Sequence, residues 1–295
     1  MSSQPTTTGL PVVPDFTTPR AAVRWFLKPT AIFSIAVLGL FVLLAAVGGH
    51  VAPYGKNEPT TSYFASPSLD FPLGTDNLGR DMLSRTIYGA QVSLQVGLLA
   101  VLIGTFSGAI VGVLTGYFGG PADFIGQRFV DILMSLPGIL LALVIAAGMG
   151  ASLFNVSLAI GIAILPTSAR IARASTLSVR ARPFVEAARS SGAGDVRIMV
   201  RHIMPNVTAP LLVIASLQLG FAILAEASLS FLGLGIPLGT PSWGNMLSGS
   251  ALLYMQRAPW MGIAPGVALT LVIMATNLLG DTLRDVFDPR MRGAK

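Results

Sequence analysis

The sequence predicts an all-α membrane protein with six transmembrane helices, and three observations support this fold class. Mean hydropathy is +0.72 and only 11% of the residues are charged, against roughly 25% in soluble domains. Long apolar runs alternate with shorter polar segments. The 19 basic residues are concentrated in alternate polar segments, which indicates orientation in a bilayer rather than binding to nucleic acid.

The composition also excludes several kinds of metal site. The chain has no cysteine, and its two histidines, His50 and His202, are far apart in sequence. Disulfides, thiolate sites and histidine-rich centres are therefore excluded, and no metal site is predicted.

The first span is predicted at residues 31–51, after a cytoplasmic tail at residues 1–30. This apolar run is long enough to cross a hydrocarbon core of about 30 Å. It exceeds the apolar region of a signal peptide, about 7–15 residues, so a retained span is expected. Residues 52–86 are predicted to be a polar extracytoplasmic loop, because four prolines prevent a long helix there: Pro53, Pro59, Pro67 and Pro72.

Five further spans are predicted to form a core over residues 87–282, followed by a cytoplasmic tail at residues 283–295. Pro137 is expected to kink the second of these five spans. Trp243 and Trp260 suit an aromatic belt at the membrane interface. The spans are expected at residues 87–116, 132–149, 153–169, 207–229 and 260–280.

A strip of glycines runs along the span at residues 87–116. Glycine recurs there every four residues, which places the strip on one face of the helix. Such a face lets a neighbouring backbone approach closely, so we interpret the strip as a packing surface. Its members are Gly104, Gly108, Gly112 and Gly116.

The distribution of basic residues predicts the orientation of the chain. Six spans place both termini on one side, and the positive-inside rule assigns the more basic side to the cytoplasm. The side opposite the termini carries Lys56, Arg80, Arg85 and Arg257. The side of the termini carries Arg20, Arg24, Lys28, Arg128, Arg170, Arg173, Arg180, Arg182, Arg189, Arg197, Arg201, Arg284, Arg290, Arg292 and Lys295.

A cytoplasmic loop at residues 170–206 contains the longest polar, basic run of the chain. We predict two short helices around a turn within it. Pro183 suits the first turn of a helix, and Glu186 is favoured in that turn by the helix dipole. Gly192 allows the chain to turn before the second helix.

The second short helix is expected to be amphipathic. Asp195 is predicted to cap its start and Pro205 to end it. Arg197 and Arg201 lie one turn apart on its polar side. The helix would therefore offer a partner an apolar ridge with a basic rim, and the ridge consists of Val196, Met199, Val200 and Ile203.

Two polar side chains lie within the predicted span at residues 207–229. Gln218 and Glu226 lie within an otherwise apolar helix, where polar groups either face a transport pathway or pair with another helix. Structural pairing is the interpretation that we favour for Glu226. A second polar group of residues, in the extracytoplasmic loop, is expected to pair locally rather than to contact a ligand: Gly74, Thr75, Asp76, Gly79, Arg80 and Asp81.

Several of these stretches together resemble one family. The run Glu186-Ala187-Ala188, then Gly192, then His202-Ile203-Met204-Pro205 resembles the EAA loop of ATP-binding-cassette (ABC) importer permeases, in the branch that includes peptide and nickel permeases. His202 and Met204 occupy its apolar and leucine positions. The likeness continues in LGTDNLGRD (residues 73–81), EASLSFLG (226–233), PSWGNML (241–247) and NLLGDTLRDVFDPR (277–290).

The resemblance implies a type I ABC importer permease fold and a multi-pass protein of the plasma or inner membrane. It implies that residues 186–205 dock on a cytoplasmic ATPase subunit. The implied partners are two such ATPases, a homologous second permease and an extracytoplasmic substrate-binding protein. ATP and Mg²⁺ would bind the ATPases. No cofactor is expected on this chain, because none of Lys28, Lys56 and Lys295 lies in a phosphate-binding GxxxxGK[ST] loop.

Alternatives remain at three points. The substrate implied is a di- or oligopeptide or nickel, and peptides are favoured because no histidine or cysteine lines the spans. A stand-alone secondary transporter or channel is the competing class, but it predicts paired intramembrane charges or broken helices in two matching halves. A non-transporting membrane scaffold is a third alternative. The loop at 170–206 could instead be an amphipathic segment on the membrane surface.

Overall fold

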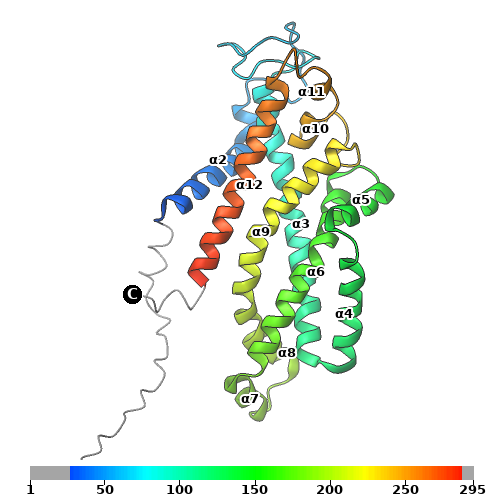
Figure 1. Ribbon diagram of the computed structural model, residues 1–295. Coiled ribbons are helices and arrows are strands. Elements are labelled where there is room, and N and C mark those ends of the chain that lie inside the picture. Colours follow the sequence, from blue (N-terminus) through cyan, green and yellow to red (C-terminus); the bar gives the residue numbers. More distant parts are fainter. Residues whose placement is uncertain (1–26, 288–295) are drawn as a thin grey trace, which may run out of the picture.

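The computed structural model describes residues 27–287, and its regular elements are helices (Figure 1). The predicted tails, at residues 1–30 and 283–295, lie largely outside this range. In chain order the elements are α2 (Pro29–Val51), α3 (Met82–Phe118), α4 (Gly120–Met134), α5 (Gly138–Met149), α6 (Leu153–Arg180), α7 (Pro183–Ser190), α8 (Asp195–Ile198), the π-helix η1 (Met199–Ile203), α9 (Met204–Phe231), α10 (Trp243–Leu247), α11 (Ser250–Leu253) and α12 (Trp260–Phe287).

Within residues 27–287, five helical stretches are long and apolar enough to cross a membrane: α2, α3, α6, α8 to α9, and α12. The bent pair α4 and α5 makes the number six if it forms one span. The all-helical membrane fold predicted from composition and periodicity is therefore confirmed. In Figure 1 the hairpin of α7 and α8 lies at one end of the bundle, and the loop before α3 lies at the other with α10 and α11.

The 37-residue helix α3 is the central element of the bundle. Asp81 precedes the helix and caps it, because its carboxylate accepts a hydrogen bond from the backbone N–H of Ser84. Gly119 follows the last residue and has φ +68°, a conformation that favours glycine. The helix starts five residues before the predicted span at 87–116 and brings Arg85 into its first turns.

The glycine strip lies where α3 meets α6, and these two helices make the most extensive contact in the bundle. A Cβ on Gly108 would lie 2.6 Å from the Leu165 carbonyl oxygen and 2.6 Å from Ser168 Cβ. A Cβ on Gly104 or Gly112 would likewise collide with the backbone of α6, and one on Gly116 would lie 3.0 Å from a backbone oxygen of α6. The two backbones approach this closely because these positions lack side chains.

The predicted span at residues 132–149 is corrected by the structure. Pro137 does not merely kink a helix there: α4 and α5 meet at an angle of 86°. Proline disfavours a helical conformation in the preceding residue, and it cannot donate the backbone hydrogen bond that would continue the helix. Two ion pairs also tie α4 to α6, between Arg173 and Asp123 at 2.6 Å and between Arg170 and Asp131 at 2.8 Å.

Trp243 corrects the expectation of an interfacial belt. Its side chain is fully buried, packs edge-on against Phe41 at 5.4 Å, and donates from Nε1 to the Thr86 carbonyl at 3.1 Å. Trp260 is half-buried and donates to the Thr75 carbonyl at 3.0 Å. Trp243 therefore attaches α10 to α3, and Trp260 attaches the loop before α3 to α12.

Candidate functional site

The hairpin of α7 and α8, together with η1 and the start of α9, contains the residues predicted to couple to a partner. Pro183 occupies the first turn of α7 and Glu186 is acidic in that turn. Gly192 adopts φ +81°. Its N–H bonds to the Arg189 carbonyl and the N–H of Ala193 to the Ala188 carbonyl, which is the Schellman arrangement that ends a helix at glycine.

Two predictions about the second helix are wrong. Asp195 does not cap α8, because Gly194 is the cap residue and Asp195 lies in the first turn. Pro205 does not end the helix, because α8 continues through η1 into α9. In an α-helix the proline ring clashes with the carbonyl four residues earlier. The wider π turn gives that ring room, and the Met204 N–H bonds five residues back to the Met199 carbonyl.

The π turn also divides the predicted apolar ridge. Ile203 is fully buried, together with Ile198 five residues before it. Val196 and Val200 are 70% and 66% exposed, and Met199 is half-buried. We use the term outer face of the hairpin for Phe184, Val196 and Val200, which are exposed apolar side chains, with the exposed basic residues Arg197 and Arg201.

The ring of Phe184 contacts His202, a residue of the stretch that resembles the EAA loop. The two rings stack with centroids 6.4 Å apart, so α7 packs on η1. Nδ1 of His202 is buried and has no hydrogen-bond partner among the described residues. Ala187 and Ser190 are exposed on α7, and Ala188 packs against the buried cluster around Ile198 and Ile203.

Tyr117, to which no role was assigned from the sequence, joins the hairpin to α3. Its hydroxyl donates to Asp195 Oδ1 at 2.6 Å and accepts from Arg189 Nη2 at 3.3 Å. The guanidinium groups of Arg180 and Arg189 lie 6.0 and 5.8 Å from its ring centroid, within cation–π range. The hydrogen bond from Arg189 to Tyr117 raises the pKa of Arg189, with smaller contributions from Asp195 and Glu186.

Glu226 is fully buried and paired at the other end of the bundle. Its carboxylate accepts hydrogen bonds from Ser93 Oγ at 2.9 Å and Ser230 Oγ at 2.8 Å. Ser93 Oγ in turn accepts from the backbone N–H of Trp243 at 3.2 Å. The group therefore joins α3, α9 and α10, an arrangement that fits structural pairing.

Gln218 makes a similar connection deeper in the bundle. Its Oε1 accepts from Thr105 Oγ1 and Ser168 Oγ, each at 3.2 Å, and its Nε2 donates to the Ile164 carbonyl at 3.5 Å. Both ends of the amide are thus used within this chain, between α3, α6 and α9. No periodicity signal links these partners, because they are 113 and 50 residues away in sequence.

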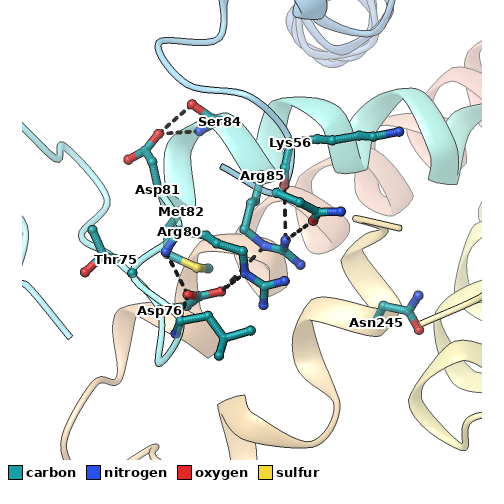
Figure 2. Close-up of polar contacts among 12 residues, drawn as sticks. Lys56, Thr75, Asp76, Arg80, Asp81, Met82, Ser84, Arg85 and Asn245 are labelled. Carbon is teal, nitrogen blue, oxygen red and sulfur yellow. Dashed lines mark hydrogen bonds and ion pairs between the residues drawn. The ribbon is translucent and has the colours of Figure 1, made fainter. Parts of the chain in front are cut away.

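The motif residues of the loop before α3 come together around Asp76 (Figure 2). Asp76 Oδ1 accepts from the backbone N–H groups of Leu78 and Arg80, and Oδ2 accepts from Arg80 Nε at 2.7 Å. Gly74 and Gly79 have φ +71° and +72°. Thr75 Oγ1 donates to the Ser62 carbonyl at 2.6 Å.

Arg85 extends this cluster beyond the residues predicted. Its Nε lies 3.8 Å from Asp76 Oδ2, and its Nη1 donates to the Lys56 carbonyl at 3.2 Å and to Asn57 Oδ1 at 2.9 Å. The polar groups of the loop are therefore largely satisfied by one another, which fits the interpretation of local pairing. A small cavity of ≈ 40 Å³ lies beside them, against α10 and α12.

Comparisons with known proteins define the class to which this fold and hairpin belong. The family model described as binding-protein-dependent transport system inner membrane component matches residues 108–293. The chain belongs to this family. It is a multi-pass protein of the inner membrane and a permease subunit of an ABC importer, and subunits of this kind do not themselves hydrolyse ATP.

Relatives agree over most of the chain. The di/tripeptide transport system permease protein DppC of Pseudomonas aeruginosa is 42% identical, covering 86% of this chain and 86% of that protein. The glutathione transport system permease protein GsiD of Pectobacterium atrosepticum is also 42% identical, with 86% of each chain covered. A solved structure of the MetNI methionine ABC transporter in inward-facing conformations is similar in fold, with a TM-score of 0.57, 20% identity, and coverage of 70% of this chain and 98% of that chain.

Proposed function

We propose that this chain is one of two permease subunits that move di- or oligopeptides inward across the membrane, driven by ATP hydrolysis on two separate subunits. ATP and Mg²⁺ bind those ATPases, and an extracytoplasmic binding protein delivers the substrate. The peptide assignment follows the names of the relatives, which are permeases for dipeptides, di/tripeptides and glutathione. Nickel is the alternative substrate within the same class.

The proposed mechanism rests on the structure of the α7–α8 hairpin, which has an exposed apolar outer face and a buried inner side. Its outer face exposes Phe184, Val196 and Val200, and exposed apolar groups with a polar rim mark an interaction surface. Its inner side is fixed to the bundle by Val185, Ile198 and Ile203, which are all buried. An ATPase seated on the outer face would therefore move the hairpin and the long helices together. The ATPase-contacting segment that we propose is residues 186–205.

The orientation of the chain is part of this proposal. The end of α6, the hairpin and η1 carry Arg170, Arg173, Arg180, Arg182, Arg189, Arg197 and Arg201, whereas the opposite end carries only Lys56, Arg80, Arg85 and Arg257 among the described residues. We therefore assign the end with the hairpin and both termini to the cytoplasm. The Asp76 cluster and α10 then face the extracytoplasmic side, where a binding protein arrives.

Cysteine labelling tests this orientation. The chain has no cysteine of its own, and Ser66 and Ser190 are both exposed. We expect an impermeant maleimide added to intact cells to label Ser66→Cys and not Ser190→Cys, and permeabilisation to make both react. Labelling of both variants from outside contradicts the assignment.

Affinity purification tests the proposed function. We expect the tagged chain, isolated from its own membrane in mild detergent, to bring down an ATPase with a phosphate-binding loop and a second permease, each in stoichiometric amount. A chain that purifies alone, or with copies of itself, and still transports substrate would be a secondary transporter.

A further inference from the structure

We infer that the Tyr117 hydroxyl is the polar link through which movement of the α7–α8 hairpin reaches α3, so that Tyr117 is a positioning residue for coupling. The inference rests on the proposed function, because it assumes that an ATPase moves the hairpin. In this inference the Tyr117 side chain connects docking of the ATPase to movement of the transmembrane helices.

Two side-chain hydrogen bonds join the hairpin to the bundle. In the part of the chain that the structure describes, the side-chain hydrogen bonds that leave residues 183–198 both end on the Tyr117 hydroxyl. The other attachments are the continuous backbone from α8 through η1 into α9, the stacking of Phe184 on His202, and apolar packing around Val185 and Ile198. Apolar contacts have no directional preference, whereas a hydrogen bond to a carboxylate fixes both distance and direction.

The link through Tyr117 lies where four helices meet. Tyr117 is 3% exposed and is the penultimate residue of α3. Its hydroxyl bridges α7, through Arg189, and α8, through Asp195. Arg180 at the end of α6 donates to the Gly116 carbonyl at 3.4 Å and lies over the same ring. Four helices thus meet at one phenol, so neither half of the hairpin can turn without displacing it.

Helix α3 connects Tyr117 to the opposite end of the bundle. This helix has 37 residues without a break, a length of about 55 Å at 1.5 Å per residue. Its opposite end is bonded to α10 through Ser93 and through the Thr86 carbonyl, both to Trp243. The glycine seam also binds α3 closely to α6. A displacement of Tyr117 is therefore carried by a rigid pair of helices to the extracytoplasmic end.

Phenylalanine at position 117 isolates the hydroxyl, because the ring and its stacking on Arg180 and Arg189 remain. The outer face of the hairpin is unchanged, so we expect the ATPase to co-purify with Tyr117→Phe in native amount. We expect substrate transported per ATP hydrolysed, measured in proteoliposomes, to fall by about tenfold. That factor is the lower limit, because it corresponds to the loss of one hydrogen bond to a charged group, and the Tyr117 hydroxyl makes two.

Asp195 provides a rescue test that a purely structural role would fail. Asp195→Asn keeps a carbonyl oxygen that accepts from Tyr117, so it should retain more coupling than Asp195→Ala, which loses this bond. The double variant Tyr117→Phe with Asp195→Ala should be no worse than Tyr117→Phe alone, since Tyr117→Phe already removes the bond to Asp195 as well as the one from Arg189. Tyr63→Phe is the matched control, because Tyr63 is 62% exposed.

The outcomes separate this inference from the proposed function. If the native chain binds no ATPase, the proposed function fails. If the native complex couples ATP hydrolysis to transport and Tyr117→Phe couples equally well, the function stands and the link through Tyr117 is wrong. Loss of ATPase binding in Tyr117→Phe also contradicts the inference, because the hydroxyl would then serve docking rather than transmission.

Discussion

Replacing Gly192 with tryptophan, or Glu186 with lysine, is expected to reduce ATP-driven uptake by more than tenfold while both variants still insert in the membrane. Gly192 adopts φ +81° in the turn that ends α7. Any other residue costs about 1–2 kcal/mol in that conformation, and a large side chain there would also intrude on the proposed ATPase-contacting segment. Glu186→Lys puts a positive charge in the first turn of α7, where the helix dipole disfavours it.

The neighbouring Gly194 supplies the control for the backbone argument. A Cβ on Gly192 or on Gly194 would meet nothing within 4 Å, but Gly194 has an ordinary φ of −67°. We therefore expect Gly192→Ala to weaken co-purification of the ATPase and Gly194→Ala to leave it unchanged. Normal uptake in both Gly192→Trp and Glu186→Lys would mean that the hairpin is only an amphipathic segment on the membrane surface.

Gly108→Leu is expected to have the largest effect on assembly. The nearest atoms to its new Cβ would be the Leu165 carbonyl oxygen and Ser168 Cβ, both at 2.6 Å. Backbone atoms cannot move aside as a flexible side chain can, so α3 and α6 must separate. We expect the free energy of unfolding to fall by at least roughly 3 kcal/mol, the upper end of the usual cost of overpacking. In size-exclusion chromatography the peak of monodisperse complex should disappear.

Gly39→Leu is the matched control for this substitution. Gly39 lies within α2, and a Cβ there would meet nothing within 4 Å. The same change of residue in a transmembrane helix should therefore leave the complex intact. If Gly108→Leu and Gly112→Leu both assemble normally, the glycine strip is not a packing seam.

The elements that sequence could predict are those governed by local chemistry. Apolar length identified the long helices, and the four-residue period of the glycines identified the face of α3 that meets α6. Pro183 and Gly192 marked the start and end of α7, because proline and glycine limit backbone conformation in ways that neighbours hardly alter.

The features that sequence missed depend on contacts between distant segments. The break at Pro137 is accompanied by ion pairs from Asp123 and Asp131 to helix α6, which a kink rule does not include. The π turn at Met199–Ile203 changes the helical period by one residue, so a ridge drawn with α-helical spacing included the buried Ile203 with the exposed Val196 and Val200. Tyr117 is 78 residues from Asp195, beyond the range of any periodicity.

Uptake by a reconstituted complex tests the central claim most directly. The chain, its partner permease and two ATPases are placed in liposomes, with ATP and Mg²⁺ enclosed at the side of the hairpin and binding protein with labelled dipeptide at the other. We predict accumulation of dipeptide that requires both ATP and the binding protein and is lost with Gly192→Trp. Accumulation by this chain alone, driven by an ion gradient without ATP, would contradict the account.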